Sequence, residues 1–124
     1  MEKTRSQILE TFLLHQRYLQ RVEAYVNGHA PTADLCAPAE CPLGRWYYRD
    51  AIQNPLLHNY PGFRRLGDLH RRFHQYTEMA VRLHDAGNLS RAYDLLREAV
   101  GLSGEIGSLL LEMDAFIESQ PASV

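Results

Sequence analysis

The sequence predicts an all-α fold, a four-helix bundle of three long helices and one short helix. Apolar residues recur at steps of three and four through three long segments, which is the period of an amphipathic helix. No segment of useful length alternates apolar and polar residues with the period of two that a half-buried strand shows. The chain has 124 residues, 45% of them hydrophobic and 23% charged, enough for one domain with its own core. We therefore expect a single domain over residues 1–124.

The first long helix is expected to end at Asn27-Gly28, where glycine can adopt the left-handed conformation that closes a helix. One position on its apolar stripe is occupied by a histidine, His15. A loop is predicted over about residues 28–40, because alanine, threonine and two prolines replace the helical pattern there. The apolar stripe of the helix consists of Ile8, Phe12, Leu19, Val22 and Val26.

The short helix is predicted from Pro42 to about Gln53, and prolines at positions 55 and 61 interrupt the next stretch. The second long helix is predicted from Phe63 to about His84. Gly87 follows it, and we expect this residue to be the left-handed cap.

The last long helix is predicted over 89–117, with a repeat of seven residues that favours near-parallel packing against other helices. Gly101, Gly104 and Gly107 lie within it, and each lowers helix propensity by about 1 kcal/mol relative to alanine. Close approach of a neighbouring helix would offset this loss, and a kink is the alternative. Apolar positions left over on this helix suggest a two-fold homodimer, and they are Leu95, Leu102, Leu109 and Phe116.

Composition and charge exclude several function classes. A formal net charge of −2 and a pI near 6.3 argue against an electrostatic nucleic-acid binder. No apolar run is long enough to span a membrane, and the first residues enter an amphipathic pattern without a signal-peptide core. Only two cysteines occur, Cys36 and Cys41, too few for a disulfide scaffold. We expect a reduced, cytoplasmic protein that contacts neither membrane nor nucleic acid.

Four residues form a candidate metal site. His15 interrupts an apolar stripe, His70 and His74 lie one helical turn apart on one face, and Cys41 precedes the short helix. Three imidazoles and one thiolate suit tetrahedral Zn²⁺. Each residue also has a structural interpretation, as a hydrogen-bonded core histidine or a small buried cysteine. A disulfide between Cys36 and Cys41 would be unusual in a cytoplasmic protein. Spacing alone leaves the metal and structural interpretations open.

Three stretches of the sequence carry a resemblance to a known family. The run Cys-Pro-Leu-Gly-Arg-Trp over 41–46 resembles the Cys-x-Leu/Phe-Gly-Lys/Arg-Trp signature of the chemoreceptor zinc-binding (CZB) domain. Residues 61–66, followed by His70 and His74, are similar to that family's Pro-x-Phe-x-x-Leu before a His-x-x-x-His pair. His15 and the residues after it resemble the first-helix pattern, with Tyr18 in place of the more usual tryptophan.

The resemblance implies a cytoplasmic, bacterial zinc-binding regulatory domain, a four-helix bundle that associates as a two-fold homodimer. Its zinc ligands would be His15, Cys41, His70 and His74. Members of this family are attached to chemoreceptors or diguanylate cyclases, whereas this chain has no recognisable output domain. The ending over 119–124 resembles a tail, which favours a standalone protein acting on a separate signalling partner over an isolated domain.

The expected function is non-enzymatic: a sensor that transmits zinc occupancy, and oxidation of Cys41, to a signalling output through the short helix. Two alternatives stay open. One is an oxidant sensor in which zinc poises Cys41, and the other is a purely structural, zinc-stabilised dimerisation module. A metal-dependent hydrolase would need an open coordination position, which four protein ligands do not leave. The free ring nitrogens are expected to find acceptors in backbone carbonyls or in acids such as Glu10, Asp68 and Glu78.

Overall fold

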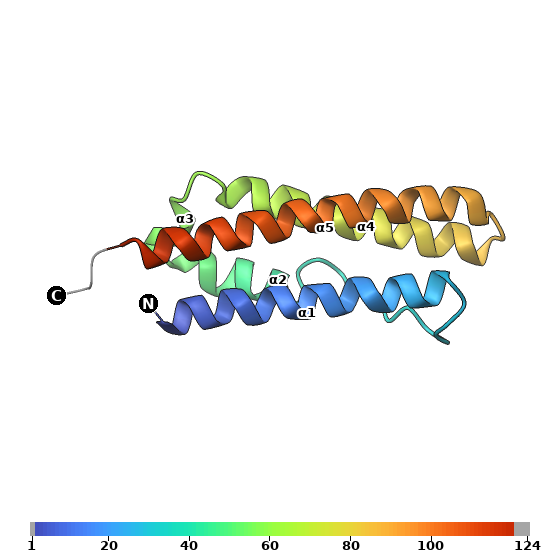
Figure 1. Cartoon of the computed structure of the whole chain (residues 1–124), viewed down its shortest axis with the longest axis horizontal. Helices are drawn as coiled ribbons and strands as arrows, with labels where there is room; N and C mark the ends of the chain where they lie inside the picture. Colours follow the sequence, from blue (N-terminus) through green and yellow to red (C-terminus); the bar gives the residue numbers. More distant parts are fainter. Residues whose placement is uncertain (1, 121–124) are drawn as a thin grey trace.

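The computed structural model describes residues 2–120, and within them every regular element is a helix. Three long helices run alongside one another: α1 (Glu2–Val26), α4 (Phe63–Asp85) and α5 (Leu89–Glu118) (Figure 1). The all-α prediction and the three long helices are therefore confirmed. The last four residues of the expected tail, 121–124, lie outside the described residues.

The predicted short helix is present but is not one regular helix. It consists of α2 (Pro42–Arg45), a π-helical turn η1 (Trp46–Asp50) and a 3-10 turn η2 (Ala51–Gln53). A π-helical turn is uncommon and is frequently found at functional sites. The irregular hydrogen bonding explains why periodicity predicted the segment but not its internal breaks.

A further short helix, α3 (Pro55–His58), was not predicted. Pro55 occupies its first turn, where a missing N–H does no harm, and the Asn54 side chain accepts a hydrogen bond from the Leu56 N–H at 3.0 Å. Four residues are too few for helical periodicity to be visible, so the Asn-Pro pair looked only like an interruption.

The turns between the long helices follow the sequence signals. Gly28, just after α1, has a φ of 80°, and Gly87, between α4 and α5, has a φ of 85°. Both therefore adopt the left-handed conformation predicted for helix-closing glycines. Asn88 then caps α5, since its side chain accepts a hydrogen bond from the Arg91 N–H at 3.4 Å.

Helix α1 packs closely on α5. A Cβ atom at Gly107 would lie 2.9 Å from the Phe12 ring, so a larger residue there would force this ring to shift. Close approach is thus the reason for one of the three glycines of α5. Gly101 and Gly104 are different, because a Cβ atom there would meet nothing within 4 Å.

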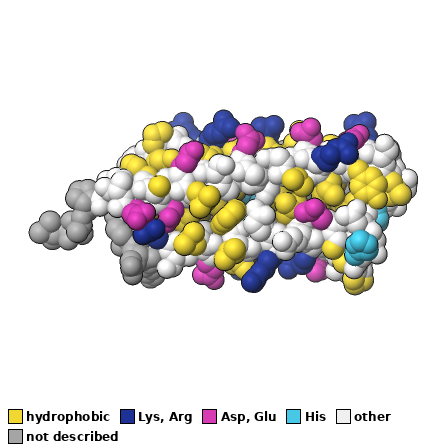
Figure 2. All heavy atoms as spheres, in the orientation of Figure 1, with side chains coloured by type: hydrophobic (Ala, Val, Ile, Leu, Met, Phe, Trp, Pro, Cys, Tyr) yellow, Lys and Arg dark blue, Asp and Glu magenta, His cyan; other side chains and the backbone are white. Residues whose placement is uncertain are grey.

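The four residues predicted to form a dimer face do not leave an apolar face free. Leu102 and Leu109 are buried within the single chain, and Leu95 and Phe116 are partly buried against its core. The large hydrophobic residues of α1 and α5 that are exposed are others, namely Leu9, Leu13, Leu89, Val100 and Leu111. Figure 2 shows hydrophobic side chains interspersed with charged ones on the side of the molecule where these two helices lie.

None of the helices within the described residues combines the length and the apolar character that crossing a bilayer demands.

Candidate metal centre

Three histidines from two helices converge in the core. α1 contributes His15, and α4 contributes His70 and His74, and one ring nitrogen of each lies within 4.8 Å of the others. The Nε2 atoms of His70 and His74 are 3.0 Å apart. The three side chains are 0%, 2% and 4% exposed, respectively, so the cluster is shielded from bulk water.

Local sequence explains this convergence. His70 and His74 are four residues apart on α4, so their rings share the face that α4 turns toward the core. His15 lies on the core-facing stripe of α1, as predicted, and its ring centroid is 4.4 Å from that of Phe73. Tyr18, one turn after His15, places its ring 5.0 Å from His74. Aromatic rings therefore hold the histidines in position.

Burial keeps the imidazoles neutral. Desolvation, followed by repulsion from His74, lowers the pKa of His15 to about 4. Desolvation and the two neighbouring histidines lower the pKa of His70 to about 2. Desolvation lowers the pKa of His74 to about 4, although the backbone of Cys36 acts in the opposite direction. Neutral imidazole is the form that binds a metal ion, so no proton has to be displaced near neutral pH.

Several of these ring nitrogens lack any hydrogen-bond partner among the described residues. They are both nitrogens of His15 and Nδ1 of His74. A buried polar atom without a partner costs about 1–3 kcal/mol, so such atoms are rare unless a ligand satisfies them. A metal ion that accepts the lone pair of one nitrogen in each ring satisfies one of the two open nitrogens of His15. The donor set therefore fits a metal ion.

The spacing fits zinc. Zinc binds histidine nitrogen at about 2.0–2.1 Å, which places two nitrogens of a tetrahedral site about 3.3 Å apart. The two Nε2 atoms of α4, 3.0 Å apart, need to separate only slightly to reach that value.

Cys41, the fourth predicted ligand, is fully buried but does not belong to the compact histidine group found among the described residues. It is the residue immediately before α2. Burial raises the pKa of its thiol, while the backbone amides of Leu43 and Gly44, the Cys36 side chain and Arg45 act in the opposite direction. The structure thus brings three of the four predicted residues together, and Cys41 is not among them.

A close backbone contact fixes the segment that carries Cys41. A Cβ atom at Gly44 would lie 1.7 Å from the Pro38 carbonyl oxygen, so any other residue would force the two backbones apart. The glycine of the Cys-Pro-Leu-Gly motif is therefore required by the loop that folds back on α2.

Tyr47 anchors the following turn to α4. Its ring stacks on Phe63 with centroids 4.3 Å apart, and its hydroxyl donates a hydrogen bond to the Phe63 carbonyl at 2.8 Å. A Cβ atom at Gly67 would lie 2.5 Å from the Tyr47 hydroxyl oxygen, so glycine makes room for it. The segment with Cys41 is consequently docked on the same helix that carries His70 and His74.

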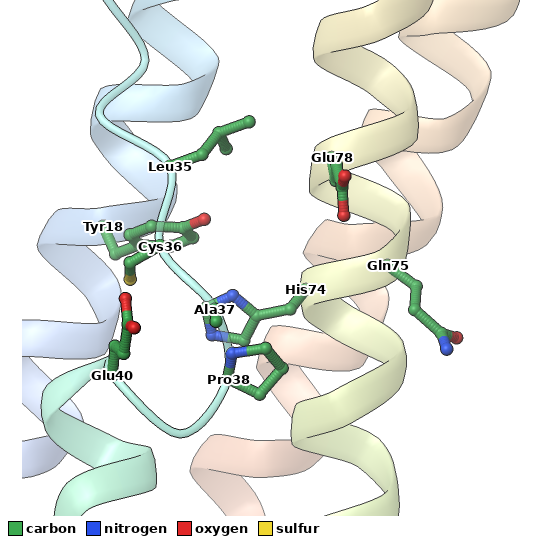
Figure 3. Close-up of a pocket in the computed structure, with 9 residues that line it drawn as sticks. All are labelled: Tyr18, Leu35, Cys36, Ala37, Pro38, Glu40, His74, Gln75 and Glu78. Atoms are coloured by element: carbon green, nitrogen blue, oxygen red, sulfur yellow. The ribbon is translucent and has the colours of Figure 1, made fainter.

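A cavity of about 380 Å³ leads from solvent to the cluster, between the loop before α2 and α4. Figure 3 shows the His74 ring directed toward the loop at Ala37 and Pro38. Cys36 also lines this cavity, and sequence reasoning missed it as a site residue. Its signal was only its position five residues before Cys41.

The acids expected to orient the histidines do not do so. Asp68 pairs with Arg71, and Glu78 pairs with Arg82, on the surface of α4. Glu10 is an exposed residue of α1. The open nitrogens of His15 and His74 show that none of these carboxylates reaches them.

Comparison with known proteins agrees with this geometry. The sequence profile of the chemoreceptor zinc-binding domain matches residues 15–81, which begin at His15 and include Cys41, His70 and His74. Searches among curated proteins and solved structures returned no match. Since the profile covers more than half of the chain, the protein belongs to the chemoreceptor zinc-binding domain family.

Proposed function

We propose that this protein is a non-enzymatic zinc-binding regulatory domain whose ligands are His15, His70, His74 and Cys41. The observation that carries the proposal is the group of three buried, neutral imidazoles whose nitrogens lie within 4.8 Å of one another. At His15 both ring nitrogens lack a protein partner. A bound zinc ion would supply a Lewis acid that accepts the lone pair of one of these two nitrogens.

Cys41 is the best candidate for the fourth ligand. Its thiol is buried, follows the docked loop and begins the motif typical of the family. Zinc favours a mixed set of nitrogen and thiolate ligands in closed, four-coordinate sites. Four protein ligands leave no position for a reactive water, which supports a regulatory rather than a catalytic role.

The regulated element is the segment over α2, η1 and η2. When His15, Cys41 and the histidine pair of α4 share one ion, they connect α1, α2 and α4. Short, irregular turns make up this segment, and its proposed link to the ion is Cys41 at its start. Loss of the ion is expected to loosen it and to change what it presents to a signalling partner. We further propose a cytoplasmic homodimer, with the exposed Leu13 and Val100 in its interface.

A competition titration against a chromophoric zinc chelator tests the site. The wild-type chain is expected to bind one zinc ion, and His70→Ala or His74→Ala is expected to weaken binding by more than about 100-fold, since even supporting residues contribute up to that factor. Cys41→Ala is expected to weaken binding less severely, without unfolding the chain. His29→Ala, an exposed histidine of the loop, is the matched control and should leave affinity unchanged.

Two results would contradict the proposal. One is wild-type protein that binds no zinc, and the other is Cys41→Ala protein with unchanged affinity. Exchange of bound zinc on a timescale of minutes would distinguish a sensor from a purely structural zinc module. Sedimentation across a wide concentration range tests the dimer, and Leu13→Glu should favour the monomer if Leu13 lies in the interface.

A further inference from the structure

The two cysteines of the chain lie at the two ends of one tight turn. Cys36 is half-buried and lines the cavity, whereas Cys41 is fully buried at the start of α2. Between them the Ala37 carbonyl accepts hydrogen bonds from the N–H groups of Glu40 at 3.0 Å and Cys41 at 3.1 Å. The chain therefore reverses direction between the two thiols.

Neighbouring contacts keep this turn in place. The Pro38 carbonyl lies against Gly44, so the loop cannot swing away from α2 without losing that contact. The side chains of Cys36 and Cys41 lie close enough to interact with each other. A disulfide needs two cysteines a short distance apart, and the turn at Ala37 keeps these two near each other.

We propose that Cys36 and Cys41 form an intramolecular disulfide when the protein meets a two-electron oxidant of the peroxide or hypochlorous acid class, with Cys36 as the thiol that meets the oxidant. Its effect on zinc rests on the proposed function, in which Cys41 is a ligand.

Exposure decides the order of the two steps. Cys36 lines a cavity open to solvent, while the exposed fraction of Cys41 is 0%. A small oxidant that enters the cavity therefore reaches the Cys36 sulfur first.

The chemistry balances with a peroxide as oxidant. The Cys36 thiolate attacks one peroxide oxygen, the O–O bond breaks, and Cys36 becomes a sulfenic acid while hydroxide leaves. The Cys41 sulfur then attacks the Cys36 sulfur, an S–S bond forms and the S–O bond breaks. The second hydroxide takes the remaining thiol proton. Overall two thiols lose two electrons and two protons, and the peroxide is reduced to two waters.

The disulfide removes the Cys41 thiolate from the proposed ligand set. The zinc affinity of the oxidised protein should then fall by about the same factor as in Cys41→Ala. A dithiol reductant restores both thiols by exchange, so the change is reversible. The cysteine pair thus makes zinc occupancy dependent on oxidant.

Peptide mapping of the full chain tests the cross-link. Metal-free protein is treated with hydrogen peroxide or hypochlorous acid, remaining thiols are alkylated, and the protein is digested with trypsin. No Lys or Arg lies between Arg21 and Arg45, so both cysteines fall in the peptide 22–45. The proposal predicts that this peptide becomes lighter by two hydrogens and carries no alkyl group.

Two single variants separate the roles of the thiols. In Cys41→Ser protein, Cys36 is expected to accumulate as a sulfenic acid that a 1,3-diketone probe traps. In Cys36→Ser protein, Cys41 is expected to be oxidised about tenfold more slowly than the wild-type pair, because it is buried. Equal oxidation of Cys41 in wild-type and Cys36→Ser protein would overturn the assignment of Cys36 as the oxidant-facing thiol.

A measurement of zinc release distinguishes failure of the disulfide proposal from failure of the proposal that Cys41 is a zinc ligand. Zinc release from loaded wild-type protein, followed with an indicator dye, should keep pace with cross-linking and should be about tenfold slower in Cys36→Ser protein. A peptide that gains oxygen, or a cross-link between two chains, would overturn the disulfide. A disulfide that forms without any loss of zinc affinity would instead overturn Cys41 as a ligand.

Discussion

Replacement of His15 by leucine separates a metal ligand from a structural histidine. The His15 side chain is 0% exposed, and neither ring nitrogen has a partner among the described residues. Leucine has a similar volume and no polar atoms. In the metal-free protein, the substitution should therefore remove the free-energy cost of two unpartnered nitrogens. In the zinc-bound protein, the same substitution removes a ligand.

The magnitude follows from the unpartnered nitrogens. A buried polar group without a hydrogen bond costs about 1–3 kcal/mol, so metal-free His15→Leu should be more stable than wild type by about that amount. Zinc at 100 times its dissociation constant stabilises the wild-type protein by about 2.7 kcal/mol through mass action. The variant, having lost a ligand, should gain far less. With zinc present, His15→Leu should therefore no longer have the larger free energy of unfolding, and wild type should equal or exceed it in stability.

Urea unfolding followed by far-UV circular dichroism measures both states, once with excess chelator and once with excess zinc. The same two proteins are titrated against a zinc chelator to measure affinity. If metal-free His15→Leu proved less stable than wild type, His15 would be a hydrogen-bonded core residue and the argument from open nitrogens would be wrong. Phe73→Leu is a suitable control for packing, because it alters the ring beside His15 without removing a nitrogen.

Three other predictions follow from the same structure. Lowering the pH from 7 to 5 should destabilise the metal-free protein. The pKa of His15 and that of His74 are each about 4 in the folded protein, against 6.5 in the unfolded chain. The unfolded chain therefore binds more protons than the folded protein between these pH values, and acid favours unfolding. Each histidine contributes about 2 kcal/mol to this loss, and a urea midpoint that is the same at both pH values would contradict it. Gly44→Ala should displace the loop before α2, at a loss of about 1–3 kcal/mol and with weaker zinc binding, because its Cβ would lie 1.7 Å from the Pro38 carbonyl oxygen. Gly101→Ala is its matched control and should stabilise the chain by up to about 1 kcal/mol, since its Cβ meets nothing within 4 Å. Tyr47→Phe should lose about 1–2 kcal/mol in urea unfolding, because the buried Phe63 carbonyl loses its donor, and an unchanged midpoint would show that stacking alone holds the turn.

The long helices could be predicted from the sequence because the buried face of each one requires apolar residues at steps of three and four. The same logic located His15, which occupies a core position without being apolar, and the pair on α4, whose spacing of four fixes a shared face. Their convergence was predicted only through the family resemblance, since periodicity places residues on a face but does not say which faces meet.

The short elements were less predictable for a physical reason. The turn η1 depends on Tyr47 docking against Gly67 and Phe63, a contact between segments about twenty residues apart that no local pattern encodes. The relation between Cys36 and Cys41 depends likewise on the Pro38 carbonyl lying against Gly44. In both cases a glycine makes room for the contact, but only the structure shows that Tyr47 lies against Gly67 and Pro38 against Gly44.

The energetics of the histidine cluster are consistent with the regulatory role proposed above. Three imidazoles are buried with pKa values of about 4 or below, and some of their nitrogens lack partners, so the metal-free site opposes folding. When an ion binds to the folded protein, its binding free energy is added to the stability and offsets the unfavourable contribution of the empty site to folding. The segment around Cys41 is the part that we expect to respond, because it consists of short turns and carries the proposed fourth ligand, whereas the long helices bury continuous stripes. We therefore predict that removal of zinc leaves the long helices in place and changes how this segment docks on α4.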